Sequence, residues 1–429
     1  MKPYKELDKQ ELLALKDTLE KEFEVTKGKG MRLNIARGKP DFNQLDLSMP
    51  MMDEINSKSD MRTLLGNDTR TYGDLDGIGE CRRLMAAMMS VEKDNVVICG
   101  NSSLNIMYDT VSRSVTQGVN GHTPWCKLDE VKFLCPVPGY DRHFKITEYF
   151  GIEMINIPLY EDGPDMDLVE KHVNNDPAVK GIWCVPKYSN PTGISYSDET
   201  VRRFANLRPA APDFRIYWDN AYSLHHLYPD NRDEILSIKE ECDKAGNPDM
   251  YYIFSSTSKI SFPGSGISAI ASSPANVKHI LHQMSIQTIG HDKINQLRHA
   301  RFFKDFAGLQ AHMDKHAELM RPKFELVADT LEKELGGLDI GVCTRPRGGY
   351  FISFDSMPGC AIDIVAKCKE LGLILTEAGA SYPYGKDPQD TNIRIAPTFP
   401  ELPELKEAVL AFALCVKLVS VNKLLRENN

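Results

Sequence analysis

Lys259 closes a run of residues whose types favour nucleophilic chemistry. The residues before it, Tyr252–Ser258, pass from an apolar stretch typical of a buried strand to hydroxyl side chains. A lysine held against apolar surface has a lowered pKa, because burial disfavours its ammonium form, and the neutral amine can attack a carbonyl carbon. Serines are small donors that suit a phosphate. The run indicates a Schiff base to pyridoxal phosphate; a solvated lysine at a strand end is the alternative.

Two more polar residues each follow a strand-like run. Asn190 comes shortly after the apolar run Gly181–Pro186, and Asp219 directly follows Phe214–Trp218. In open α/β sheets, ligands bind beyond the carboxyl ends of the strands, so one crevice can collect Asn190, Asp219 and Lys259. The alternatives are ordinary structural roles. Asp219 could cap a turn or helix, and Asn190 with the proline after it could form only a turn.

The order of these residues resembles a known family. Asn190, Asp219, Tyr222 and Lys259, followed by Arg394, resemble the pattern of class I aminotransferases within the fold-type I pyridoxal-phosphate enzymes. The resemblance runs from about residue 30 to the C-terminus. Within that family, the segments Ala36–Pro40 and Ser258–Gly264 are similar to an aspartate aminotransferase-like branch allied to MocR-type proteins. The resemblance implies pyridoxal 5'-phosphate as the cofactor.

The resemblance also implies roles for the core residues. Lys259 would carry the cofactor and move the substrate proton, while Asp219 would pair with the pyridinium nitrogen and keep it protonated. Tyr222 and Asn190 would hydrogen-bond the ring 3-oxygen, and Tyr140 would stack on the ring. The implied catalytic set is Lys259, Asp219 and Tyr222. For a lone tyrosine, ordinary packing is the alternative.

A phosphate site is expected where a strand ends and a helix begins. The segment Cys99–Leu104 closes a strand and opens a helix that runs to about Val115, and a helix N-terminus suits an anion. The candidate phosphate-binding residues are Ser102, Ser103, Ser256 and Ser258. Tyr72 matches a family tyrosine that reaches the phosphate from a partner subunit, which implies a homodimer.

One position departs from the family pattern. An arginine that grips the phosphate usually stands seven or eight residues after the lysine, but Gly266 and Ile267 occupy those positions here. Another cation must then balance the phosphate. Lys293 is the first candidate, with Arg298 next.

The expected substrate is a dicarboxylic amino acid, aspartate or glutamate, whose amine passes to 2-oxoglutarate or another 2-oxo acid. Arg394 would bind the α-carboxylate as a bidentate fork, with Asn190 beside it. Gly38 lies where the family's N-terminal segment folds over the substrate. Arg37 or Arg142 would meet the second carboxylate, although either could be a solvated surface arginine.

Other functions remain open on the same residues. An aminotransferase for aromatic or other amino acids would share these residues, as would a carbon–sulfur lyase or a decarboxylase. A ligand-sensing regulator is less favoured, because only about 30 residues precede Arg37 and a DNA-binding module needs roughly 60–80.

Composition excludes several classes of protein. The 429 residues carry a formal net charge of −9, which argues against a nucleic-acid partner. No apolar run reaches the length of a membrane span; the best, Ala408–Val416, is stopped by Lys417. Ten cysteines without a CxxC pair indicate reduced thiols in the cytoplasm. His312 and His316 have metal-ligand spacing but lack a third ligand, so we expect an exposed helical face and no metal.

Alternating strand and helix patterns predict an α/β protein of the fold-type I aminotransferase kind. We expect a mostly parallel mixed sheet with helices on both faces, plus a smaller α+β domain. The expected strands are Asn95–Cys99, Val131–Cys135, Met154–Pro158, Ile182–Pro186, Phe214–Trp218, Tyr251–Phe254 and Ile267–Ala271. The last strand follows a link too short for a helical crossover, so we expect it to be antiparallel.

The expected division of the chain has three parts. Residues 1–45 would form an N-terminal arm and part of the small domain, residues 46–320 the large cofactor-binding domain, and residues 321–429 the small C-terminal domain. A long helical stretch, Ile289–Leu335, would bridge the two domains, and Pro322 would break it.

Overall fold

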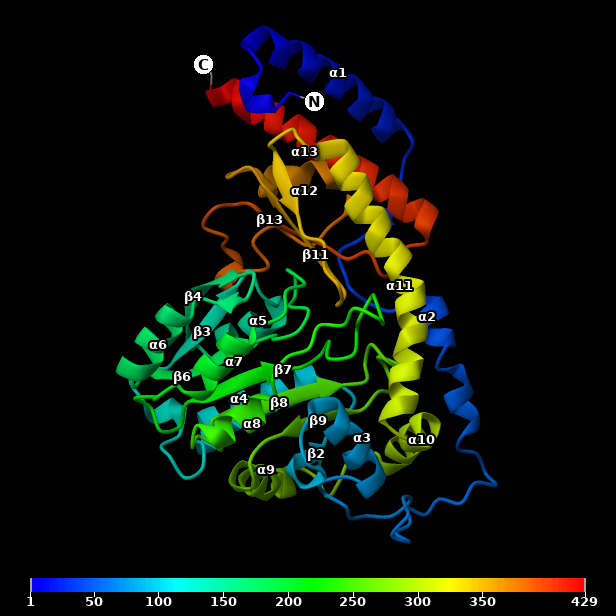
Figure 1. Ribbon diagram of the computed structural model, residues 1–429, viewed down its shortest axis with the longest axis vertical. Coiled ribbons are helices and arrows are strands. Elements are labelled where there is room, and N and C mark those ends of the chain that lie inside the picture. The colour runs from blue at the N-terminus through cyan, green and yellow to red at the C-terminus, as the bar shows by residue number, and fades with distance from the viewer. Residues whose placement is uncertain (1, 428–429) are drawn as a thin grey trace.

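The computed structural model describes residues 2–427, and an eight-stranded sheet forms its centre (Figure 1). The strands, in the spatial order β2-β9-β8-β7-β6-β3-β4-β5, are β2 Val96–Ile98, β9 Ser268–Ala271, β8 Tyr251–Ser256, β7 Arg215–Asp219, β6 Val179–Cys184, β3 Lys132–Val137, β4 Glu153–Tyr160 and β5 Gly163–Pro164. β9 is antiparallel to both of its neighbours, as predicted. The sequence missed β5, an antiparallel edge strand of two residues. The predicted mostly parallel mixed sheet is confirmed.

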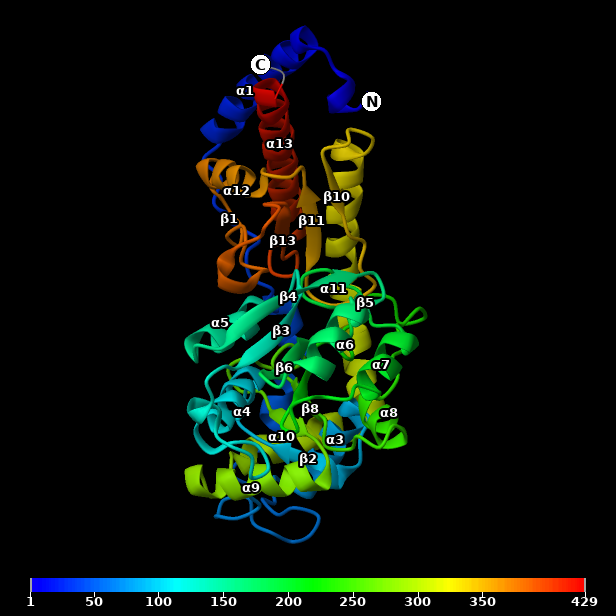
Figure 2. The ribbon, with the colours of Figure 1, turned by 90° about the vertical axis from the view of Figure 1, so that its left-hand side faces the viewer.

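Helices cover both faces of this sheet (Figure 2). They are α3 Gly79–Met89, α4 Ser103–Gln117, α5 Asp141–Tyr149, α6 Met166–Asn175, α7 Asp198–Ala205, α8 Ile238–Lys244, α9 Pro274–Gln287 and α10 Lys293–Phe303. Side chains alternate between two cores, because successive residues of a strand point to opposite faces. Ile216 and Trp218 belong to one hydrophobic cluster, whereas Tyr217 between them belongs to the other. Burial on both faces explains the continuous apolar runs of these strands.

A smaller α+β unit stands above the large sheet in Figure 1. It contains the antiparallel strands β10 Gly341–Cys343, β11 Ile352–Ser356 and β13 Asn392–Ile395, and the parallel pair β1 Leu33–Asn34 and β12 Leu373–Ile374. Its helices are α1 Lys9–Gly28, α11 Phe306–Leu335, α12 Ala361–Glu370 and α13 Leu402–Glu427, and the short α2, Phe42–Asp46, lies along α11. One core collects residues from both chain ends, and Tyr188, Tyr222 and Leu227 from the middle of the chain also belong to it. The domain boundaries stay a prediction.

α13 is the core helix of this unit. Among residues 2–427 it alone is long and apolar enough to cross a membrane, but 78% of its most apolar window is buried inside the protein. A helix that is hydrophobic all round is expected at the centre of such a core. Figure 1 shows α1, α11 and α12 packed around it.

Two expectations about the bridging helix were wrong. Pro322 lies inside α11, and the chain breaks earlier, between α10 and α11, where Lys304 has a φ of 63°. His312 and His316 are buried, with their Nε2 atoms 3.1 Å apart, and His312 Nε2 lies 3.0 Å from the Ile260 carbonyl. Burial lowers the pKa of His316 to about 3, so its ring is neutral. These histidines pack the interior, and no cluster of metal ligands occurs among the described residues.

A buried ion pair fastens the N-terminal segment to α11. Lys323 donates to the Asp41 carboxylate and, at 2.9 Å, to the Thr398 carbonyl. Asp41 also caps α2 by accepting from the backbone N–H of Gln44 at 2.8 Å. Both partners of the ion pair are nearly inaccessible to solvent. The segment that carries Arg37 and Gly38 is therefore held against the long helix.

We predict that Lys323→Met lowers the free energy of unfolding by about 3 kcal/mol, because Asp41 is left as an unpaired buried charge. Urea unfolding monitored by circular dichroism measures the change. The control is Lys5→Met at the exposed pair between Lys5 and Asp339, which should cost less than about 1 kcal/mol. An equal decrease in the free energy of unfolding in Lys323→Met and Lys5→Met would show that the buried ion pair contributes no more than the exposed one.

Candidate active site

A cavity of about 900 Å³ lies between the carboxyl ends of the sheet strands and the smaller unit. It brings together residues that are far apart in the sequence. The predicted residues that line it are Arg37, Gly38, Tyr140, Arg142, Asn190, Tyr222, Lys259 and Arg394. Of the three residues expected to share a crevice beyond the strand ends, Asn190 and Lys259 line this cavity, whereas Asp219 is buried and does not.

Lys259 follows β8, and its amine lies near two aromatic rings. Its Nζ lies 5.0 Å from the centre of the Tyr222 ring and 5.8 Å from that of Tyr350. The Tyr350 hydroxyl donates to the Lys259 carbonyl at 3.4 Å. Burial lowers the pKa of the Lys259 amine, while the charge of Asp219 acts in the opposite direction. Burial is the larger effect, so the neutral amine forms more readily than on a surface lysine.

Asp219 ends β7 and is almost completely buried. One carboxylate oxygen, Oδ2, lies 2.9 Å from Nε2 of His143. The His143 ring is stacked on Trp183, with ring centres 4.4 Å apart, so the histidine holds the carboxylate in a fixed orientation. The other oxygen, Oδ1, is buried and has no hydrogen-bond partner among the described residues. An anion with one oxygen fixed and one unpartnered suits a protonated ring nitrogen of a ligand.

The N-terminus of α5 supplies three residues of the site. Tyr140 precedes the helix, Asp141 is its first residue, and His143 lies in its first turn. The Tyr140 ring meets His143 edge-on at 4.9 Å. Burial and the charge of Asp219 raise the pKa of Tyr140; burial and the nearby phenol of Tyr140 raise that of Tyr222. Both phenols therefore stay protonated at neutral pH and can donate hydrogen bonds.

Arg394 lies on β13 and enters the cavity from the smaller unit. Its Nη1 lies 2.8 Å from Oδ1 of Asp141 and 3.4 Å from Oδ1 of Asn190. The guanidinium carbon is 4.8 Å from the centre of the Phe351 ring. Gly38 lies against the same ring, because a Cβ at position 38 would come within 2.6 Å of it. Phe351 thus contacts both Arg394 and the N-terminal segment, and Thr376 also links the two, because its hydroxyl accepts from Nη2 of Arg394 at 3.3 Å and donates to the Ala36 carbonyl at 2.7 Å.

The four candidate phosphate serines lie outside the lining of this cavity, but their loops meet. Ser102 caps α4 by accepting from the N–H of Leu104 at 3.3 Å. Ser258 donates to the carbonyl of Asn101 at 3.0 Å, and Ser256 donates to Ser258 at 3.2 Å. Ser103 is the first residue of α4. Hydroxyls beside a helix N-terminus form a suitable donor set for a phosphate.

The loop after Lys259 carries no arginine. A Cβ at Gly266 would lie 3.1 Å from the carbonyl oxygen of Phe262, a tight contact that a shift of a few tenths of an ångström would relieve, and Ile267 already places a buried side chain beside it. Lys293 does not reach this loop: its Nζ lies 3.1 Å from the Gly73 carbonyl and 3.6 Å from Asp74. Arg298 does, because its Nη2 donates to the Ser265 hydroxyl at 2.6 Å.

Tyr72 does not enter the cavity of its own chain, and its side chain is 82% exposed. Asp141, His143 and Phe351 are the site residues that the sequence did not identify. The spacing of His143, three residues after Tyr140 at a helix start, was the available signal for it. Nothing in the sequence distinguished Phe351 from an ordinary strand residue.

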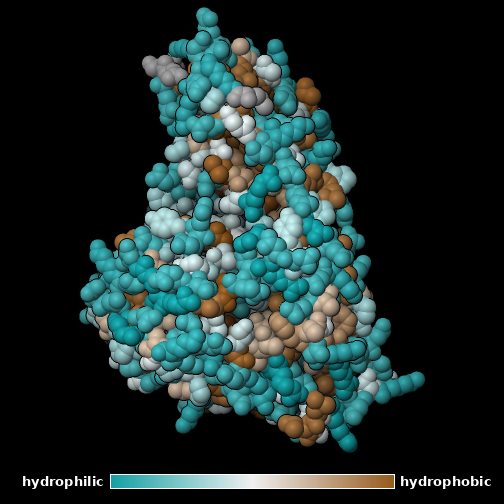
Figure 3. Space-filling model, in the orientation of Figure 1, coloured by the Kyte–Doolittle hydropathy of each residue, from teal (hydrophilic) through white to brown (hydrophobic). Residues whose placement is uncertain are grey.

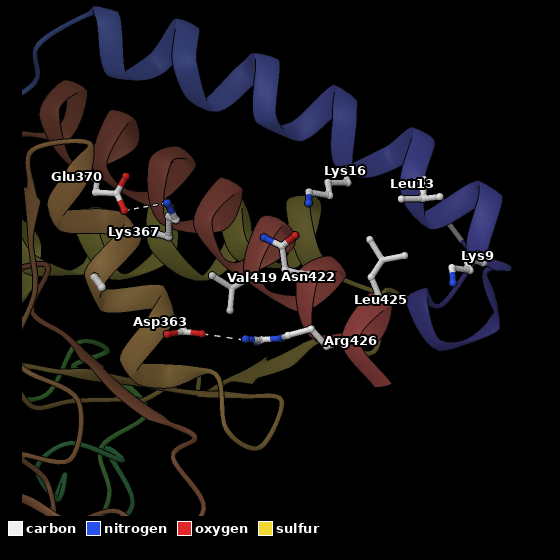
Figure 4. A pocket seen from close by; sticks show the side chains of 11 residues that line it. Lys9, Leu13, Lys16, Asp363, Lys367, Glu370, Val419, Asn422, Leu425 and Arg426 are labelled. Atoms are coloured by element: carbon white, nitrogen blue, oxygen red, sulfur yellow. Dashed lines mark hydrogen bonds and ion pairs between the residues drawn. The ribbon is translucent and has the colours of Figure 1, made fainter. Parts of the chain in front are cut away.

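A second cavity, of about 750 Å³, lies between α1, α12 and α13, away from Lys259 (Figure 4). Its walls carry charged side chains that pair with one another. Lys367 binds Glu370 at 2.8 Å, and Arg426 lies 3.6 Å from Asp363. Val419 and Leu425 form part of its apolar lining. None of the predicted catalytic residues lines it.

We predict that the Lys259 amine in cofactor-free protein reacts with a small aldehyde and borohydride at a lower pH than the exposed Lys5 amine. The pH at which half of the Lys259 amine is modified is the midpoint of this reaction. Asp219→Asn should shift that midpoint to still lower pH, because the Asp219 charge favours the ammonium form of Lys259. Peptide mass spectrometry across a pH series measures both midpoints. An upward shift in Asp219→Asn would contradict the electrostatic account.

Comparison with known proteins agrees with this geometry. Residues 7–428 match the profile of the family described as Aspartate amino-transferase. An aspartate aminotransferase from Corynebacterium glutamicum is 44% identical over 94% of this chain and 93% of its own length. A crystal structure of an aspartate transaminase from the same species superposes with a TM-score of 0.96 at 42% identity, covering 98% of this chain and 99% of that one.

A more distant structure shares the fold alone. An α-aminoadipate aminotransferase from Thermus thermophilus, complexed with N-(5'-phosphopyridoxyl)-L-leucine, has a TM-score of 0.73 at 18% identity over 90% of this chain and 92% of that one. The profile match and the 44% identity both extend over nearly the whole sequence. The chain therefore belongs to the aspartate aminotransferase family and is an aminotransferase of fold type I.

Proposed function

We propose that this aminotransferase uses pyridoxal 5'-phosphate to move the amine of aspartate or glutamate to 2-oxoglutarate or another 2-oxo acid. One observation carries the proposal: Lys259 and Arg394 line a single cavity, and the charge of Asp219 acts on the Lys259 amine. A nucleophilic amine and a carboxylate receptor in one cavity suit an α-amino acid. The name of the 44% identical relative supports aspartate.

The residues present fit the cofactor. Pyridoxal phosphate, when bound, supplies an aldehyde and an electron-withdrawing ring that stabilises negative charge at the substrate Cα. Lys259 would hold the aldehyde carbon, and the free oxygen of Asp219 would accept from the ring nitrogen. Tyr140 would pack against the ring. Tyr222 and Asn190 would hydrogen-bond its 3-oxygen, and the serines at the start of α4 would hold the phosphate.

The proton transfer depends on Lys259. Once the substrate amine has replaced Lys259 on the cofactor, the freed amine, which burial favours in its neutral form, would accept the Cα proton and return it to a neighbouring carbon. Arg394 would orient the substrate by its α-carboxylate, and the ring of Phe351 supports the guanidinium. Gly38 leaves room for that ring, which keeps the N-terminal segment close to the substrate.

We assign the compensating cation to Arg298 rather than Lys293. Arg298 binds Ser265, in the loop that approaches Asn101 through 3.4 Å contacts to the carbonyls of Pro263 and Gly264. Lys293 is instead engaged with Gly73 and Asp74. A guanidinium at this loop would offset the phosphate charge without an arginine at position 266.

A homodimer is the assembly that we propose, with Tyr72 reaching the partner's phosphate site. Tyr72, Leu64 and Leu65 are each at least 80% exposed and lie in the segment between α2 and α3. In Figure 3, hydrophobic side chains gather near the lower end of a mostly hydrophilic face, where this segment runs in Figure 1. Exposed apolar side chains that gather on one surface can mark a contact with another protein chain.

The proposed location is the cytoplasm, and the proposed ligands are small amino and 2-oxo acids. The cysteines among the described residues are free thiols, most of them buried, as expected in a reducing compartment. The net charge of −9 gives no basis for a nucleic-acid partner. No role at a membrane is proposed.

We predict that Lys259→Ala abolishes transamination between aspartate and 2-oxoglutarate and removes the visible absorption of lysine-bound cofactor. A coupled assay and a spectrum of the purified protein measure both. The control is Lys187→Ala, because Lys187 is a second buried lysine whose pKa burial lowers, and it should retain most of the turnover. Full turnover in Lys259→Ala would exclude the proposed mechanism, and release of ammonia by the wild type would indicate a lyase.

The substrate assignment rests on unpaired cations at the cavity. Arg37 and Arg142 both line it, and neither has an ion-pair partner among residues 2–427. Either can meet a side-chain carboxylate. Aromatic residues such as Tyr382 and Phe399 line the cavity too, which keeps an aromatic substrate as the second candidate.

We predict that kcat/KM for aspartate exceeds that for phenylalanine by roughly a hundredfold or more, because phenylalanine leaves the arginine unpaired. Arg37→Ala and Arg142→Ala identify the receptor: one should lose most of the preference for aspartate while its activity on phenylalanine is unchanged. A wild-type preference for phenylalanine would overturn the dicarboxylate assignment and leave the aminotransferase class intact.

A further inference from the structure

Asp141 places a carboxylate of the protein where a substrate carboxylate is expected. Its Oδ1 lies 2.8 Å from Nη1 of Arg394, the guanidinium proposed to bind substrate. Both residues line the cavity of Lys259. Within the described residues, Asp141 is the only ion-pair partner of Arg394. In this state the receptor for an anion is already neutralised by an anion of the chain.

The rest of the guanidinium is incompletely satisfied. Nη1 has a long contact of 3.4 Å to Asn190, and Nη2 one of 3.3 Å to the Thr376 hydroxyl. Nε is buried and has no hydrogen-bond partner among residues 2–427. Arg394 itself is only 8% exposed. A buried arginine with spare donors and a single anionic partner has the donor geometry to accept another carboxylate in exchange.

We propose that Asp141 is an internal substitute for the substrate carboxylate: it holds Arg394 in the empty site and is displaced when an amino acid or 2-oxo acid binds. The proposal rests on the proposed function of Arg394. Asp141 thereby sets how tightly carboxylates bind, because each ligand exchanges with a charge already present instead of filling a vacant receptor.

The exchange is feasible because Asp141 has another favourable environment. It is the first residue of α5, where the partial positive charge of the helix N-terminus stabilises a carboxylate. Its side chain is 27% exposed on the cavity side, whereas Arg394 is nearly buried. The aspartate can therefore turn toward water while the arginine stays supported by Phe351.

Succinate binding to the cofactor-loaded enzyme tests the proposal, because succinate carries two carboxylates and no amine and so does not react. Isothermal titration calorimetry should show that Asp141→Asn lowers the dissociation constant about tenfold, as expected when a competing charge is removed. Asp141→Ser, which also lacks the charge, should lower the dissociation constant of succinate too. Glu148→Gln is the matched control: Glu148 lines the same cavity but pairs with Lys145, so succinate affinity should change less than twofold.

The uncharged diamide of succinate separates competition from a general change of the site. Asp141→Asn should not tighten its binding, because it has no carboxylate to exchange. The gain for succinate should also vanish when Arg394→Ala is added. Unchanged or weaker succinate binding in both Asp141 variants would overturn the proposal and show that Asp141 only orients Arg394. Aspartate turnover by the wild type tests the proposed function separately, so the two failures are distinguishable.

Discussion

The carboxyl group of Asp219 lies in the protein core, where an unpaired polar group is costly, and neighbouring side chains hold it in place. His143 binds one oxygen, and stacking on Trp183 fixes the histidine. The same charge acts on the Lys259 amine and on the Tyr140 phenol, in each case opposing loss of the proton. The charge of Asp219 therefore adds to the effect of burial on the pKa of Tyr140 and opposes the larger effect of burial on the pKa of Lys259.

The fold brings the strand ends around Asp219 together with residues of the smaller α+β unit. Arg394 arrives on β13, while Gly38 arrives on a segment anchored by the ion pair of Asp41 and Lys323. Gln44, beside Asp41, donates to the Tyr350 hydroxyl at 2.9 Å, and Tyr350 in turn reaches the backbone of Lys259. Polar contacts thus connect the segment around Asp41 with the backbone of Lys259 through Gln44 and Tyr350.

Much of this arrangement follows from sequence patterns alone. Apolar runs predict the strands that precede Asn190 and Lys259 and the strand that ends at Asp219, and the short link before β9 predicts its direction. Contacts between distant segments could not be predicted, because no local pattern records them. His143 meets Asp219 only after α5 packs on the sheet, and Asp141 meets Arg394 only across the cavity. The expectation that His312 and His316 lie on an exposed helical face was wrong, because a four-residue spacing occurs equally on buried and exposed faces of a helix.

The Phe351 ring is close to both Gly38 and Arg394. This arrangement makes position 38 unusually intolerant of change, although no side chain there touches a substrate. A single methyl group would push against the ring, and the ring would pass that displacement to the guanidinium. Natural variation at position 38 should therefore be limited by the space that the Phe351 ring occupies beside Arg394.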